Sequence, residues 1–185
     1  MSARAPAVSI PARLPVSDLA QLIEVSVEEV QAVLVSRGEP SSPTDMIGPE
    51  SSADVASTLG RRVRIESRDL ALEALYEFDA RGETETGQLP DRAAAMVEGV
   101  LRDRERLDHE IEAASEHWSV ARMPAVDRTI LRLGLYELES QPDTPTAVIV
   151  SEAVRLAQTY STEKSGAFVN GVLAALARAV RHDAM

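Results

Sequence analysis

Apolar residues recur every three or four positions along most of this chain, a spacing that predicts amphipathic helices. Near the N-terminus the stretch LPVSDLAQLIEVSVEEVQAVLVSRG contains two such helical segments. Ser26 and Glu29 form a capping box before the second helix. Gly38 follows that helix, where a left-handed residue is needed. The pattern therefore predicts two short helices joined by a tight turn, a helix-turn-helix arrangement.

The sequence around this pair of helices is less regular. Residues 1–13 are rich in Pro and Ala and predict a disordered tail, and residues 39–52 are rich in Pro, Ser and Gly and predict a loop. A third short helix is expected over residues 53–60. The following RRVRIE predicts a short extended piece. Residues 14–66 are therefore expected to form a small helical module.

From Ser67 to the C-terminus the apolar spacing is helical almost throughout. The charged run from Arg102 to Arg106 divides the longest stretch into two helices. Pro124 suits a first helical turn, and Pro142 and Pro145 end the helix that begins there. Helices are predicted over 67–82, 91–118 (as two), 124–140, 145–161 and 163–180. Residues 67–185 are therefore expected to form a second, all-α domain.

Composition excludes several classes of protein. Apolar residues make up 44% of the chain and aromatic residues 3%, so the core must consist of Ala, Val, Leu and Ile. The absence of Cys excludes disulfides and thiolate chemistry, and three His are too few for a convincing metal site. The sequence contains no stretch of about 18 apolar residues, so no membrane span is expected. The N-terminus does not resemble a secretory signal, so a cytoplasmic protein is expected.

The net charge of −11 excludes broad, nonspecific binding to nucleic acid. Residues 1–66 hold 6 basic and 9 acidic groups, and the remainder holds 13 basic and 21 acidic groups. Any RNA contact must therefore come from a local cluster of cations. All Lys and Arg positions except Lys164 are Arg. Arg suits bidentate contacts to phosphates and bases, but genomes rich in G and C also favour Arg, and that is the simpler explanation.

Three segments in the second domain resemble the NusB family of bacterial transcription antitermination factors. They are RDLALEALYE (68–77), MPAVDRTILRLGLYEL (123–138) and SEAVRLAQTYSTEKSGAFVNGVL (151–173). The resemblance covers roughly residues 67–181 and implies a compact all-α fold of about seven helices. It also implies pairing with the ribosomal protein NusE, binding of boxA-type leader RNA, and a place in the antitermination complex on RNA polymerase. Some members self-associate, so a homodimer stays open.

The first module resembles a different family. SDLAQLIEVSVEEVQAVLVSRG followed by ADVASTLGRRVRIE is similar to the small N-terminal domain of bacterial translation initiation factor two. This resemblance covers roughly residues 14–66. It does not identify what the module binds.

The NusB resemblance assigns RNA contacts to an Arg-rich segment at the start of the domain. Here the segment is RRVRIESRD, in which Arg64 and Arg68 match the family pattern. Arg61 and Arg62 add positive charge, whereas Ile65 and Glu66 replace positions that are often basic. Such arginines can neutralise phosphates, although a run of charge is more often a solvated surface.

The EKSGAFVNG run supplies further candidates for RNA binding. Lys164 can meet a phosphate, and Ser165 can either donate to a phosphate or cap the last helix. Phe168 can stack on an unpaired base, or it can belong to the core because it lies at helical spacing with Val172. We expect these residues and the Arg-rich segment to form one continuous RNA track.

Three residues are candidates for the face that binds the ribosomal protein. They are Tyr76, Asp127 and Glu137. Tyr76 combines an apolar ring with a hydroxyl, which suits interfaces. Asp127 falls in a first helical turn, where the helix dipole favours a carboxylate for purely structural reasons. Nearby Arg128 and Arg132 favour internal salt bridges.

No nucleotide, metal or hydrolase motif is present, so neither an enzyme nor a bound cofactor is expected. One alternative is a protein-only adaptor that has lost RNA binding. Another is a DNA reader, which is disfavoured because Glu28 and Glu29 begin the second helix and repel phosphate. NusB-like modules also occur fused to ribosomal RNA methyltransferases, but no such catalytic domain is present here.

Overall fold

The computed structural model describes residues 7–83, 86, 89–115 and 118–181 of the chain. The chain divides into two compact units, residues 1–69 (unit 1) and 70–185 (unit 2), each of which is described by itself. Within the described residues, no helix is long and apolar enough to cross a membrane.

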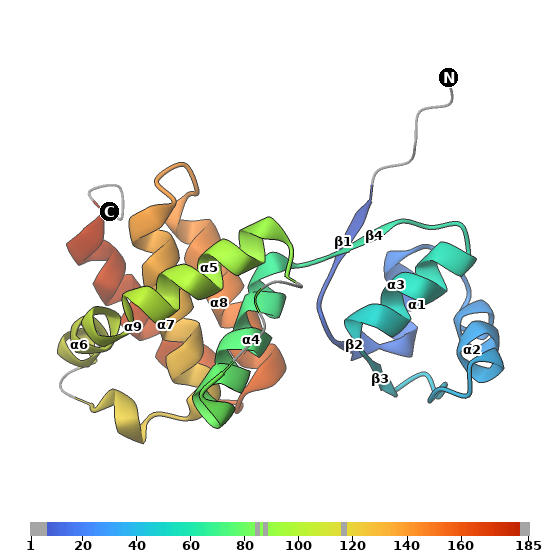
Figure 1. Cartoon of the computed structure of the whole chain (residues 1–185), viewed down its shortest axis with the longest axis horizontal. Helices are drawn as coiled ribbons and strands as arrows, with labels where there is room; N and C mark the ends of the chain where they lie inside the picture. Colours follow the sequence, from blue (N-terminus) through green and yellow to red (C-terminus); the bar gives the residue numbers. More distant parts are fainter. Residues whose placement is uncertain (1–6, 84–85, 87–88, 116–117, 182–185) are drawn as a thin grey trace. The chain divides into compact units, whose positions relative to one another are not determined.

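Unit 1 combines short helices with two small sheets (Figure 1). Its elements are β1 (Val8–Ile10), β2 (Leu14–Pro15), α1 (Val16–Leu22), α2 (Val27–Ser36), β3 (Met46–Ile47), α3 (Pro49–Thr58) and β4 (Val63–Ile65). Strands β2 and β3 pair antiparallel, and β1 and β4 pair parallel. Helices α1 and α2 confirm the predicted helix-turn-helix, and β4 confirms the predicted extended piece.

The capping box of α2 forms as predicted. The Ser26 Oγ accepts from the Glu29 backbone N–H at 3.2 Å, and the Glu29 carboxylate accepts from the Ser26 backbone N–H at 2.9 Å. Both partners satisfy backbone donors that a helix start otherwise leaves unpaired. Gly38 follows α2 with φ of 71°, the left-handed conformation expected of a residue that ends a helix.

Two predictions for unit 1 differ from the structure. The predicted disordered tail does not hold for Val8–Ile10, because β4 supplies a pairing partner from the other end of the unit. Helix α3 begins at Pro49, inside the predicted loop, because Pro suits the first position of a helix. The predicted loop also contains β3. These short strands carried no clear sequence signal because their partners lie far along the chain.

Unit 2 is built from helices. Its elements, with α4 beginning at the end of unit 1, are α4 (Ser67–Arg81), α5 (Asp91–Arg102), α6 (Arg104–Ala114), η2, a 3-10 helix (Val120–Arg122), α7 (Ala125–Ser140), α8 (Thr146–Tyr160) and α9 (Ser165–Val180). The break between α5 and α6 falls at Asp103, within the charged run that predicted it. The all-α fold class predicted for this domain is confirmed.

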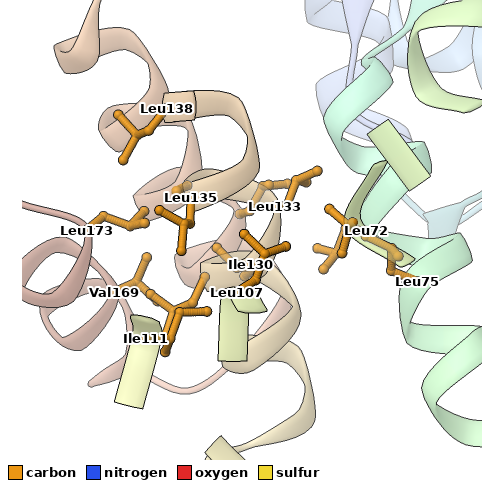
Figure 2. Packing of buried hydrophobic residues seen from close by; sticks show 14 of the residues in the cluster. Leu72, Leu75, Leu107, Ile111, Ile130, Leu133, Leu135, Leu138, Val169 and Leu173 are labelled. Atoms are coloured by element: carbon orange, nitrogen blue, oxygen red, sulfur yellow. The ribbon is translucent and has the colours of Figure 1, made fainter. Parts of the chain in front are cut away.

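The core of unit 2 forms around α7, which is buried on most of its surface. Figure 2 shows Ile130, Leu133, Leu135 and Leu138 of α7 among apolar side chains from neighbouring helices. Gly134 allows α9 to approach closely, since an added Cβ there would lie 2.8 Å from the nearest Leu173 side-chain carbon. Close packing of complementary surfaces therefore stabilises the contact between α7 and α9, in addition to apolar burial.

Arg181 closes the C-terminal end of α7. Its guanidinium donates hydrogen bonds to the backbone oxygens of Leu138, Gln141 and Thr144 at 2.5–2.7 Å, and to that of Glu137 at 3.2 Å. The last carbonyl groups of a helix have no partners within the helix. Arg181 supplies such partners and ties the segment after α9 to the end of α7.

Candidate functional site

The arginine segment, residues 61–68, begins after α3 and ends in the first turn of α4. Arg61, Arg62 and Arg64 are exposed, and Arg61 donates to the Glu24 backbone oxygen at 3.2 Å. Arg64 lies on β4, and its side chain forms no hydrogen bond or ion pair with any described residue. Arg68, by contrast, is only 9% exposed. Three of the four predicted RNA-binding arginines are therefore accessible, whereas the burial of Arg68 limits direct contact with phosphate.

Ser165 and Asp127, predicted for two different binding faces, are brought together in unit 2. Both are buried, and the Ser165 Oγ donates to Asp127 Oδ2 at 2.9 Å. The Ser161 Oγ donates to Asp127 Oδ1 at 2.5 Å. The Thr162 backbone N–H donates to the Ser165 Oγ at 3.3 Å. This network fixes the turn between α8 and α9 against the start of α7, which supports the structural role of Asp127.

Lys164 and Phe168 lie one helical turn apart at the start of α9. Lys164 is exposed and has no described partner. The Phe168 ring is partly buried against the core and contacts Trp118, with ring centroids 5.3 Å apart. Trp118 is 48% exposed. The aromatic pair therefore presents the Trp118 ring at the surface, which the sequence did not predict, because only the fold brings residues 118 and 168 together.

The other two candidates for the protein-binding face differ sharply in exposure. Tyr76 on α4 is 46% exposed, so its ring and hydroxyl are available to a partner. Glu137 on α7 is 2% exposed and lies 3.9 Å from an Arg92 nitrogen. Of the two, Tyr76 is the residue that a second protein can reach directly.

The described residues of unit 2 contain a buried cluster of ion pairs centred on Asp79. Its carboxylate lies 2.9–3.0 Å from nitrogens of Arg104, Arg128 and Arg132. Arg132 is buried and also forms two hydrogen bonds to Asp108, at 2.6 and 2.8 Å. The predicted internal salt bridges of Arg128 and Arg132 are confirmed. Their partners lie on α4 and α6.

A hollow of about 520 Å³ opens beside this cluster and is lined in part by Arg104, Arg128, Arg132, Asp108 and His109. Asp79 pairs with all three arginines, and the carboxylates of Asp108, Glu105 and Glu112 line the hollow beside them. The hollow therefore offers no excess of positive charge to an anionic ligand. We therefore assign the cluster to stability and not to binding.

The cluster predicts a specific response to acid. Burial raises the pKa of Asp79, but the hydrogen bond from Arg128 and the charges of Arg132 and Arg104 outweigh burial and hold the pKa below its usual value. A carboxyl with a lowered folded-state pKa stabilises the protein above its unfolded-state pKa of about 3.9. This stabilisation is lost as the pH falls further, through the folded-state pKa.

We therefore expect unit 2 to lose stability below about pH 4, in part through Asp79. Trp118 is the only Trp of the chain and lies in unit 2, so its fluorescence during urea unfolding reports on this unit. The difference in unfolding free energy between the unmodified chain and Asp79→Asn should shrink from pH 6 to pH 2. A difference that stays constant over this range would contradict the assignment.

The sequence predicts a single RNA track, but its candidate residues divide between the two units. Arg61, Arg62, Arg64 and Arg68 belong to unit 1, whereas Lys164, Ser165 and Phe168 belong to unit 2. The continuous track therefore stays a prediction.

Comparison with known proteins identifies what unit 2 is similar to. The NusB family profile matches residues 65–178. A transcription antitermination protein NusB from Clavibacter sepedonicus is 41% identical over 132 residues, covering 63% of this chain and 96% of the relative. The protein of the same name from Saccharopolyspora erythraea is 43% identical over 127 residues, covering 62% of this chain and 86% of the relative.

Solved structures give the same result. T. maritima NusB superposes with a TM-score of 0.56 at 31% identity, over 60% of this chain and 88% of that protein. A chain from a complex of antitermination factors NusB and NusE with double-stranded RNA gives a TM-score of 0.53 at 32% identity, over 61% of this chain and 94% of that chain.

Proposed function

Residues 65–178 of this chain belong to the NusB family, and from this premise we propose that the protein is a transcription antitermination factor. With the ribosomal protein NusE it binds boxA-type leader RNA and supports transcription of ribosomal RNA operons. The observation that carries the proposal is the similarity of its helical unit to the chain solved with NusE and RNA. Because this function consists of binding RNA and protein, we expect no catalytic activity. Because transcription takes place in the bacterial cytoplasm, we expect a cytoplasmic location.

Local chemistry supports RNA binding despite the net charge of −11. Arg64 and Lys164 are exposed cations without a described partner, so neither must break an ion pair to meet a phosphate. Trp118 is partly exposed and its ring contacts that of Phe168. It therefore offers an aromatic surface on which an unpaired base can stack. These residues supply the two contacts that single-stranded RNA readers combine, phosphate neutralisation and base stacking.

For the protein partner we propose a direct contact through Tyr76, which is exposed. Asp127 is buried, so we assign it an indirect role in which its hydrogen bonds to Ser161 and Ser165 position the turn that carries Lys164. Glu137 is buried as well and acts within unit 2. The initiation-factor resemblance of residues 14–66 stays a prediction.

The proposal is tested by titrating the full chain against a boxA-type RNA oligonucleotide, with and without NusE. We expect binding that tightens when NusE is present and weakens as salt is added, because phosphate contacts release counterions. If NusE leaves RNA binding unchanged, or if the affinity does not depend on salt, the proposal is wrong. Binding of NusE with no RNA binding would favour the alternative of a protein-only adaptor.

Arg64→Ala and Lys164→Ala are each expected to make the plot of log affinity against log salt concentration less steep by about 0.7, the contribution of one phosphate contact to a single strand. Each variant should therefore lose about fivefold more affinity at 0.1 M salt than at 1 M salt. We leave Arg68 unchanged because it is buried, so its loss would disturb the fold as well as the charge.

Arg178→Ala is the matched control. Arg178 is also exposed on α9, in its last turn, about 20 Å from Lys164 along the helix. Its loss should leave both affinity and salt slope unchanged. Equal effects from all three variants would indicate a nonspecific response to net charge.

A further inference from the structure

Strand β4, which carries Arg64, is held at both ends by β1 (Figure 1). The Val8 backbone N–H donates to the Arg62 oxygen at 2.8 Å, and the Glu66 backbone N–H donates to the Ile10 oxygen at 2.9 Å. The Ser9 hydroxyl also donates to the Glu66 carboxylate. The segment that enters the NusB-like unit is therefore a paired strand and not a free arm.

The core of unit 1 anchors this pair of strands. Ile10 of β1 is completely buried, and Val63 and Ile65 of β4 pack against the same apolar cluster. Side chains alternate between the two faces of a strand. Arg64, between Val63 and Ile65, is therefore directed away from the cluster, in agreement with its exposure. The same residues that bury β4 thus present its arginine to solvent.

Whether the backbone of the arginine segment is ordered before RNA binds affects its affinity for RNA. Fixing the backbone of a residue is entropically unfavourable, and a flexible segment loses that entropy when it binds its ligand. In this chain the backbone on either side of Arg64 is already fixed by β1. The RNA then meets an extended strand that needs no further ordering.

We propose that unit 1 is part of the RNA-binding apparatus: β1 holds the arginine segment extended, so that Arg64 and its neighbours Arg61 and Arg62 are presented to the phosphates of an RNA strand. This inference rests on the function proposed above. It assigns to the N-terminal module a positioning role that depends on the pairing of β1 with β4 and not on additional positive charge.

The first test locks the strands together. Val8 and Val63 are direct partners in the parallel pair, and the chain contains no other Cys to interfere with a Val8→Cys, Val63→Cys crosslink. In the full chain with NusE, the oxidised form should bind boxA-type RNA at least as tightly as the reduced form. Weaker binding by the oxidised form would show that RNA needs a detached segment, and would overturn the proposal.

The second test releases the strand without changing any charge. Ile10→Ser removes the buried anchor of β1, and we expect RNA affinity to fall about tenfold, which corresponds to about 1.4 kcal/mol. Adding the oxidised crosslink to Ile10→Ser should restore the affinity, whereas the reduced double Cys variant should not. Val35→Ser is the control, since Val35 lies in the same unit and is 63% exposed.

Hydrogen exchange identifies what each variant has released. The β4 amides should lose protection in Ile10→Ser, while those of α7 and α9 in unit 2 stay protected. If β4 is released and RNA affinity is unchanged, this inference fails although the proposed function stands. If the unmodified chain with NusE does not bind RNA, both fail.

Discussion

Replacing Asp79 by Ala is expected to lower the free energy of unfolding of unit 2 by about 3 kcal/mol. The Asp79 side chain is only 5% exposed and pairs with three arginines, so its removal leaves positive charges together without their common partner. The expected loss lies at the lower end of the range for a broken buried pair because Arg132 keeps its two bonds to Asp108. Arg104 and Arg128 can also reach water.

Asp103→Ala is the comparison for this variant. Asp103 also pairs with arginines, Arg102 and Arg106, but this pair lies at the surface. Exposed pairs contribute less than about 1 kcal/mol. Urea unfolding followed by Trp118 fluorescence should therefore separate the two variants clearly. Equal losses of unfolding free energy would show that the Asp79 cluster has no special weight in unit 2.

The second large loss of unfolding free energy is expected from substitutions at the contact between α7 and α9. Leu173→Ala is expected to lower the unfolding free energy by about 3 kcal/mol, because Leu173 is fully buried and a cavity would remain. Gly134→Ala alone should lower it by about 2 kcal/mol, because the new Cβ would lie 2.8–3.0 Å from the Leu173 methyl carbons.

In the double variant, Gly134→Ala should no longer destabilise, because the side chain that it would meet is gone. Helix propensity alone then favours Ala over Gly by about 0.8–1 kcal/mol. Urea unfolding of the two single variants and the double variant measures this coupling. Effects that simply add would mean that the two helices adjust their spacing freely.

Gly171→Ala is the matched control for this cycle. Gly171 lies on α9 as well, but an added Cβ there would meet nothing within 4 Å. This variant should therefore be at least as stable as the unmodified chain. Destabilisation by Gly171→Ala would show that Gly is needed in α9 for a reason other than close packing.

The sequence predicted the helices well because their signals are local. The apolar stripe of α7 and the capping box of α2 depend on residues within a few turns of one another. The NusB motifs lie in the same helical segments, so the fold of unit 2 and its family could be inferred together. The strands β1, β2 and β3 were missed because two or three residues of β structure carry no periodicity that can be recognised.

The chemistry of single residues was less predictable. Ser165 and Asp127 were assigned to different faces, yet they form one buried network across 38 positions of sequence. Trp118 was not selected, because its contact with Phe168 joins a residue just before η2 to a residue of α9, which are far apart in the sequence. Burial also separates Glu137 from Tyr76, although both were candidates for the same interface.

By itself, the sequence determined where most helices form and that the C-terminal part of the chain builds a NusB-like helical domain. Only the tertiary structure decided which charges are neutralised and which stay exposed. Asp79 meets Arg132 across 53 positions, and Arg64 lies on a strand whose partner is near the N-terminus. The physical reason is that helix formation depends on neighbours along the chain, whereas the partner of a charge or of a strand is fixed only when distant segments pack together.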